Sequence, residues 1–304
     1  MIDLLQLRAL HAVAASGSVR AAADALHVTT SALSQRLGKL ERTVGQPLLE
    51  RHGRGVKLTD AAHLLVDYAN RIFSLVEEAE ARVEAHRGAV AGRVTIAAFP
   101  TAARGLLVPT LSRLRPDHPA LTVTLREQEP HESIPLVARG DLDLAVVQDW
   151  YNAPLAIPDG LHRSPLLDDL TDVALPENHR FADREFVNLE ELSHETWVTW
   201  PPGSGCHEWL VSTLRLLGAE PDIAHTAGEY PTQFGLVAAG FGAAIIPRLG
   251  RDHLPDGVRI VPVQPVLSRH VYAVSRAESA KRPAVRAVIE AMQAVARDEL
   301  RATA

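Results

Sequence analysis

The first 60 residues alternate short apolar clusters with polar positions at helical spacing. Leucines and alanines over residues 4–15 predict one helix, and the alanine-rich run from Arg20 to Leu26 predicts a second. Thr29, Thr30 and Ser31 supply hydroxyls that can cap the start of a third helix, along which apolar residues recur toward a core at Leu33, Leu37 and Leu40. Two short helices joined tightly, the second with a polar outer face, are typical of a helix-turn-helix that enters the DNA major groove. An ordinary surface helix pair is the alternative.

Polar and basic side chains gather on the outer face of this module. Two glycines between Arg51 and Lys57 predict a tight basic turn, which we interpret as a β-wing lying along the DNA backbone. Gln35 and Arg36 are expected to contact bases or backbone. The full set of candidate DNA contacts is Ser18, Arg20, Thr29, Thr30, Ser31, Ser34, Gln35, Arg36, Lys39, Arg51, Arg54 and Lys57.

A long helical pattern without Gly or Pro runs from Asp60 to about His86. At 1.5 Å per residue it would reach roughly 40 Å. Its apolar positions alternate between spacings of four and three residues, which is typical of a coiled-coil seam. We therefore expect a dimerisation helix, although a long helix packed on its own domain is the alternative. The candidate seam residues are Leu65, Tyr68, Ile72 and Leu75.

Beyond a small-residue hinge at 87–92, strand patterns alternate with helical patterns, which predicts an α/β body with parallel pairing. Expected strands cover 94–98, 121–125, 142–147, 166–175, 197–200, 221–227, 243–247 and 270–275; expected helices cover 106–114, 133–139, 206–217, 234–239 and 281–299. The predicted domains are 1–59 (DNA binding), 60–88 (linker helix) and 89–304 (body). We expect the body to consist of two α/β subdomains, about 92–163 plus 268–304, and 164–267.

A small-molecule effector is expected between the two halves of this body, where strand ends meet helix N-termini. Exposed amides at those helix starts favour an anion. Glu127, Glu129, Asp149 and Glu229 in or beside the same loops favour a cationic or amino-bearing effector, and both alternatives stay open. The candidate effector contacts are Thr101, Ala102, Gln128, His131, Asp149, Trp200, Pro202, Ser204, Glu229, Pro231 and Thr232.

Charge is distributed unevenly along the chain. Residues 1–60 hold eight Lys and Arg against five Asp and Glu, whereas the remainder holds 23 against 32, for a net charge of −6 overall. A basic module on an acidic body directs phosphate attraction to one part of the molecule. The single cysteine, Cys206, fits a reducing cytoplasm. The N-terminus lacks a signal-peptide pattern and no apolar run approaches the ~20 residues of a bilayer span, so no membrane partner is expected.

Chemistry-bearing motifs are absent from the body. The fourteen histidines show no metal-ligand spacing, and no nucleophile elbow or phosphate-binding loop occurs. We expect no metal, no cofactor and no enzymatic activity. Cys206 is interpreted as a packing thiol, with a redox sensor as the alternative.

The N-terminal block is the most distinctive stretch of the chain. It reads SGSVRAAADALHVTTSALSQRLGKLERTVGQPLLERHGRGVKLTDAA and resembles the winged helix-turn-helix of the LysR-type transcriptional regulators. One departure lies at Thr30 and Ser31, where the family often carries glutamine and proline, and a hydroxyl cannot make the bidentate adenine contact of an amide. Gly140–Ala145 and Leu236–Pro247 resemble the family's effector-binding domain, which is itself similar to type 2 periplasmic binding proteins.

This resemblance implies a regulator whose binding to double-stranded DNA is modulated by a small-molecule effector. It also implies a homodimer or homotetramer on a pseudo-palindromic operator, with RNA polymerase as an open further partner. A ligand-independent DNA-architectural protein and an enzyme on the α/β body are the competing classes. Saturable small-molecule binding to residues 90–304 separates the first two, and turnover of that molecule would favour the third.

Overall fold

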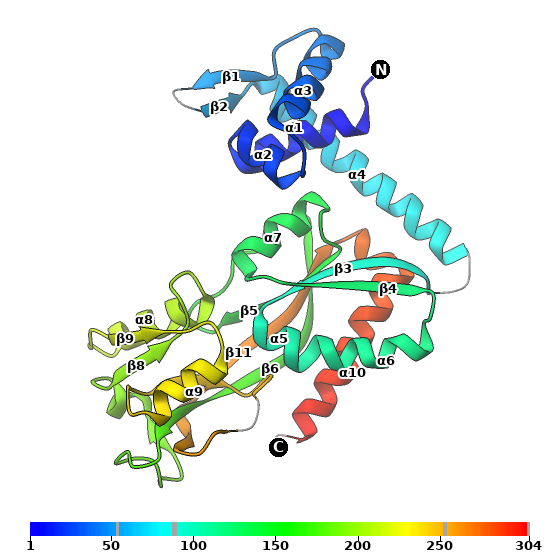
Figure 1. Cartoon of the computed structure of the whole chain (residues 1–304). Coiled ribbons are helices and arrows are strands. Elements are labelled where there is room, and N and C mark those ends of the chain that lie inside the picture. Colours follow the sequence, from blue (N-terminus) through cyan, green and yellow to red (C-terminus); the bar gives the residue numbers. More distant parts are fainter. Residues whose placement is uncertain (53–54, 87–89, 252–253, 303–304) are drawn as a thin grey trace. The chain divides into compact units, whose positions relative to one another are not determined.

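The computed structural model describes residues 1–52, 55–86, 90–251 and 254–302. It divides into two compact units, Met1–Gly88 and Ala89–Ala304. The first unit contains α1 (Leu4–Ser16), α2 (Val19–Ala25), α3 (Thr30–Val44), the hairpin of β1 (Leu49–His52) with β2 (Gly55–Leu58), and α4 (Asp60–His86) (Figure 1). The predicted helix-turn-helix, wing strands and long helix are therefore present.

Local capping explains where the short helices start. The Ser18 hydroxyl accepts a hydrogen bond from the Ala21 amide at 3.1 Å, and the Thr29 hydroxyl accepts one from the Ala32 amide at 3.1 Å. Gly45 ends α3 in the left-handed conformation, with φ +80°. The three helices bury one apolar core that contains Leu10, Leu33, Leu37, Leu40 and Leu48.

The second unit is built on a mixed sheet, seven-stranded among the described residues, in the order β10-β6-β11-β5-β3-β4, with β7 also pairing β11. Its strands are β3 (Gly92–Ala98), β4 (Leu121–Glu127), β5 (Leu144–Trp150), β6 (Leu161–Pro176), β7 (Val187–Asn188), β10 (Ala244–Pro247) and β11 (Val258–Arg276). A separate parallel pair joins β8 (Thr196–Thr199) to β9 (Asp222–Thr226). The strands β3, β4 and β5 pair in parallel, as expected, whereas β6 and β11 are antiparallel.

Helices cover this sheet in two groups. The first group comprises α5 (Pro100–Ala102), a π-helical turn (Ala103–Leu107), α6 (Val108–Asp117), α7 (Pro130–Arg139) and α10 (Pro283–Ala302); α6 and α10 pack together (Figure 1), whereas Ile134 and Val137 of α7 belong to a separate apolar core. The second group comprises α8 (Gly205–Leu216) and α9 (Tyr230–Ala238), beside β8 and β9. Short 3-10 turns cover Leu189–Leu192 and Ser279–Lys281.

Two strands are much longer than the sequence pattern predicts. The expected strand 270–275 is only the end of β11, and the expected strand 166–175 lies inside β6. Their antiparallel pairing extends from Val258 opposite Pro176 to Arg276 opposite Leu161, with a register shift between Pro262 and Leu267. Prolines and an irregular burial pattern hide such a strand from a periodicity analysis. Among the described residues, no helix is sufficiently long and apolar to cross a bilayer.

Candidate nucleic-acid interface and effector site

The exposed face of α3 is polar from its first turn onward. Thr30, Ser31, Ser34, Gln35 and Lys39 are all exposed, whereas the leucines on the opposite side are buried. This separation follows from the 3.6-residue helical repeat, which places the polar and apolar positions on different sides of the helix. The face therefore offers hydroxyl, amide and ammonium groups to solvent without disturbing the core.

The candidate contacts next to α3 are also placed on the surface of this unit. Arg20 is exposed on α2, and Arg36 is half-buried on α3. The hydroxyl oxygens of Ser18 and Thr29 accept capping hydrogen bonds. Each of these hydroxyls can still donate its hydrogen to a phosphate oxygen.

The predicted wing is described only in part. Lys57 is exposed on β2, and the backbone of Arg51 pairs with Val56 in the hairpin. The third predicted wing residue, Arg54, lies outside the described residues. The two strands of the wing therefore pair as expected. Lys57 is exposed on this hairpin.

The apolar seam of α4 divides into two parts. Leu65 packs against the core of the helix-turn-helix and Ile72 is half-buried. Tyr68 and Leu75 remain 50% and 63% exposed, as does Leu64 at 58%. The first turns of α4 lie against α1 in the same unit, and this contact accounts for Leu65. Only part of the predicted seam is therefore available to another molecule.

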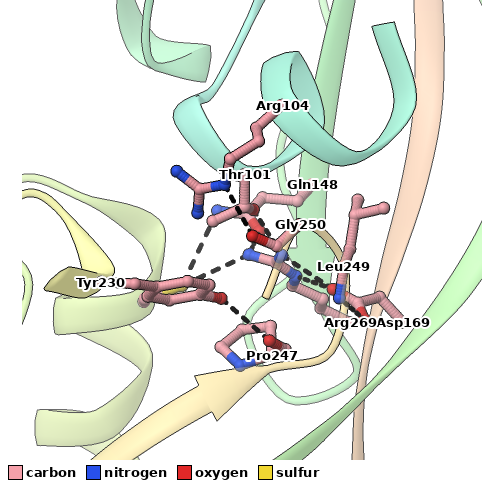
Figure 2. Close-up of polar contacts among 10 residues, drawn as sticks. Thr101, Arg104, Gln148, Asp169, Tyr230, Pro247, Leu249, Gly250 and Arg269 are labelled. Atoms are coloured by element: carbon pink, nitrogen blue, oxygen red, sulfur yellow. Dashed lines mark hydrogen bonds and ion pairs between the residues drawn. The ribbon is translucent and has the colours of Figure 1, made fainter. Parts of the chain in front are cut away.

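A buried arginine lies at the centre of the body (Figure 2). Arg269 on β11 is 1% exposed, and its Nη2 lies 2.7 Å from Asp169 Oδ2 and 2.7 Å from Thr101 Oγ1. Its Nη1 donates to Gln148 Oε1 and lies 3.7 Å from Cys206 Sγ. The guanidinium therefore joins β11, β6 and β5 to the first residues of α5 and α8. We call these five residues the Arg269 cluster.

Next to this cluster, Arg104 and Tyr230 bring α9 close to the π-helical turn. Arg104 Nε donates to the Gly250 carbonyl at 2.7 Å, and its guanidinium lies 5.2 Å from the centre of the Tyr230 ring. The Tyr230 hydroxyl donates to the Pro247 carbonyl at 2.9 Å (Figure 2). Gly250 has φ +67°, and a Cβ there would lie 2.5 Å from the Thr101 carbonyl oxygen, so the close approach requires glycine.

Burial dominates the electrostatics of these groups. It raises the pKa of the Cys206 thiol to about 11, although the neighbouring Arg269 acts in the opposite direction. Burial also raises the pKa of Tyr230. The half-buried Glu129 has its pKa raised by desolvation, against the attraction of His131 and Arg269, and its Oε2 has no hydrogen-bond partner among the described residues. Near neutral pH the Cys206 sulfur is therefore a thiol.

The predicted effector residues are only partly brought together. Thr101 joins the Arg269 cluster, Trp200 meets Tyr230 edge-to-face at 5.7 Å, and Ser204 caps α8. Gln128 is half-buried, with its Oε1 unpartnered among the described residues. The exposed members of the set are His131, Pro202, Glu229, Pro231 and Thr232.

Two of the predicted effector residues point away from the cluster. The Ala102 side chain is 0% exposed in an apolar core. Asp149 accepts from the Tyr272 hydroxyl at 3.1 Å and from the Leu155 amide at 3.2 Å, because successive side chains of a strand point to opposite faces and Gln148 faces the cluster. A ligand beside Arg269 would therefore not reach Ala102 or Asp149.

Sequence reasoning missed most of the cluster itself. Arg269 and Asp169 lie in stretches of β11 and β6 whose burial has no simple alternation, so neither stood out. Gln148 offered a weak signal, as a polar residue following an apolar strand run. Arg104 and Tyr230 carry no local pattern, since their partners are distant in sequence.

Comparison with known proteins covers nearly the whole chain. The family model for the bacterial regulatory helix-turn-helix protein, lysR family, matches residues 4–63, and that for the LysR substrate binding domain matches residues 87–297. The chain is 30% identical over 266 residues to the HTH-type transcriptional regulator YnfL of Escherichia coli, covering 86% of this chain and 88% of that protein.

One further relative and one solved structure extend the comparison. The hydrogen peroxide-inducible genes activator of Dickeya chrysanthemi is 29% identical over 263 residues, covering 86% of this chain and 85% of that one. The structure of a full-length OxyR mutant from Pseudomonas aeruginosa matches with a TM-score of 0.69 at 20% identity, over 98% of this chain and 97% of that one. With both domain models matched in order, the chain belongs to the LysR family of bacterial transcriptional regulators.

Proposed function

We propose that α3 is the recognition helix of this sequence-specific regulator and reads bases in the major groove through Gln35 and its polar neighbours. The observation that carries this proposal is the exposed polar face of α3, opposite its buried leucines. Gln35 is the residue on that face suited to a bidentate contact with adenine. Arg20, Lys39 and Lys57 supply charge for phosphates, which sets position rather than sequence preference.

The proposal extends to assembly. The exposed apolar residues of α4, Tyr68 and Leu75 among them, support a homodimer that presents two recognition helices to a pseudo-palindromic operator. A tetramer formed from such dimers, a contact with RNA polymerase and action in the cytoplasm belong to the same proposal. As a family member the protein is a transcriptional regulator, not an enzyme.

We place the effector beside the Arg269 cluster. Its groups come from the starts of α5 and α8 and from three strands, so a ligand there would touch both helical groups of the body at once. A ligand can change DNA binding only if it binds the DNA-binding arrangement of the protein more tightly or more weakly than the other arrangement.

Binding to selected DNA tests the recognition helix. A double-stranded site is first enriched from a random library with the wild-type chain. Gln35→Ala should then lose about 1–3 kcal/mol of discrimination between that site and a scrambled duplex. Gln46→Ala, an exposed glutamine outside α3, is the matched control and should keep the ratio. An unchanged ratio in Gln35→Ala would remove it from base recognition.

The wing proposal has a separate readout. Lys57→Ala should weaken binding to both duplexes equally and reduce the slope of log affinity against log salt by about one unit. An unchanged slope would show that Lys57 contacts no phosphate.

A further inference from the structure

A cavity of about 750 Å³ opens on the body apart from the Arg269 cluster. It lies between the later turns of α8, the end of β5, the 3-10 turn at Leu189–Leu192 and the stretch of β11 from Gln264 to His270. None of the five residues of the Arg269 cluster lines it. This volume lies within the range of sites for small organic molecules.

The wall of this cavity is built on a regular helix-on-strand contact. Cys206, Trp209 and Thr213 share one face of α8, and Gln148, Trp150 and Asn152 alternate along β5 and the residues after it. Three pairs connect them: Gln148 Nε2 lies 3.8 Å from Cys206 Sγ, Trp150 and Trp209 stack with ring centres 4.0 Å apart, and Asn152 Nδ2 donates to Thr213 Oγ1 at 3.1 Å.

This contact holds the cavity wall in place before any ligand arrives. Trp209 Nε1 donates to Asn152 Oδ1 at 2.8 Å, so the indole is oriented from within the protein. Both indoles are almost fully buried, at 2% and 3% exposure. A pre-organised apolar wall spares a ligand the cost of ordering side chains.

Large apolar side chains also surround the opening of the cavity. Tyr151, Leu216 and Val266 are 91%, 77% and 63% exposed, and each lines the cavity. Isolated exposed apolar residues need no explanation, but a group around one concave site indicates a binding surface.

The charge of the lining selects the kind of ligand. Its described residues include Glu190, Glu191 and His270, whose Nδ1 lies 2.6 Å from the carboxylate of Asp168, and no lysine or arginine. The Glu191 carboxylate accepts a hydrogen bond from Arg184, which lies outside the lining, and another from the Asn188 backbone amide. These two bonds hold the pKa of Glu191 below its usual value. Glu190 is exposed and has no side-chain hydrogen bond or ion pair among the described residues, so its carboxylate is available to a cation. The Tyr151 ring offers a second, cation–π contact.

We propose that this cavity is a second ligand site, which takes an organic cation with an apolar or aromatic body. The apolar part lies against Leu216 and the edges of the two indoles, and the cationic group lies between Glu190 and the Tyr151 ring. The same face of α8 begins at the Arg269 cluster, because Cys206 lies on it. Occupation of the cavity therefore stabilises the contact of α8 with β5 that both sites share.

Isothermal titration of the full chain, without DNA, tests this site with three probes of matched size. Phenethylammonium should bind saturably and at least tenfold more tightly than phenylacetate, with 2-phenylethanol between them. Glu190→Gln should weaken phenethylammonium about two- to fivefold, the range of an exposed ion pair, and leave 2-phenylethanol unchanged. Tyr151→Ala should weaken phenethylammonium about two- to fivefold as well.

Controls and contrary outcomes follow from the same design. Glu185→Gln removes an exposed carboxylate that does not line the cavity and should leave all three affinities unchanged. No saturable binding, equal affinity for phenylacetate, or an unaltered charge preference in Glu190→Gln overturns the proposal. A lower oligomeric state of Tyr151→Ala in sedimentation also overturns it, because a second copy would then cover the cavity. Because the titration contains no DNA, its outcomes can be interpreted even if the DNA-binding proposal fails.

Discussion

Replacing Arg269 by methionine removes the positive charge from the centre of the body while keeping a long side chain. The ion pair that it breaks is fully desolvated, with Arg269 and Asp169 1% and 2% exposed. Loss of Arg269 leaves the Asp169 carboxylate buried, with the Leu249 amide, which donates to its Oδ1 at 2.8 Å, as its remaining hydrogen-bond donor among the described residues. Breaking a buried pair in this way costs about 3–5 kcal/mol.

This cost converts into a large change in melting temperature. For a domain of this size, 1 kcal/mol corresponds to roughly 2–4 °C, so Arg269→Met should lower the melting temperature of the body by roughly 6–20 °C. Circular dichroism of the full chain during heating measures it. The double variant Arg269→Met, Asp169→Asn should recover part of the loss, because it no longer buries an unpaired charge.

An exposed ion pair of the same chemistry provides the control. Arg113 and Asp298 are 2.6 Å apart with about half of each side chain exposed, at 50% and 51%. Such pairs contribute about 0–1 kcal/mol, so Arg113→Met should shift the melting temperature by less than roughly 4 °C. If Arg269→Met and Arg113→Met lower the melting temperature equally, the Arg269 cluster does not stabilise the body as we describe.

Three further predictions test the glycine contact, the buried thiol and the dimer. Gly250→Ala should lower the melting temperature of the body more than Gly160→Ala, since both have positive φ but only the Cβ at Gly250 would meet backbone; equal losses would contradict this close contact. Iodoacetamide at pH 8 should alkylate Cys206 roughly 100-fold more slowly than an ordinary thiol, and the rate should climb between pH 9 and 11. Stability should also fall over that pH range, because there only the unfolded chain has lost the thiol proton; an ordinary alkylation rate would restore the redox-sensor alternative. Tyr68→Asp with Leu75→Asp should give monomers in sedimentation, whereas Asn70→Asp, which adds a single negative charge to an exposed residue of α4, should not; a persistent dimer would place the interface elsewhere.

Local chemistry determined the N-terminal unit to a large extent. The hydroxyls of Ser18 and Thr29, the leucine repeat of α3 and Gly45 at its end each act within a few residues, and they specify helix starts, faces and ends directly. The same locality explains why the α/β character of the body, and most of its elements, could be predicted from periodicity.

The centre of the body was decided only in three dimensions. Arg269 meets Thr101, Gln148 and Asp169 across sequence separations of 168, 121 and 100 residues. Those contacts arise because β6 and β11 pair in an antiparallel register that places Arg269 directly opposite Asp169, and neither segment alone specifies that pairing. Strand alternation then decided which neighbour faces inward, so that Gln148 enters the cluster and Asp149 does not. The sequence likewise could not predict that Leu65 packs on its own unit. A heptad pattern identifies apolar positions but does not say whether the same chain or a second chain covers them.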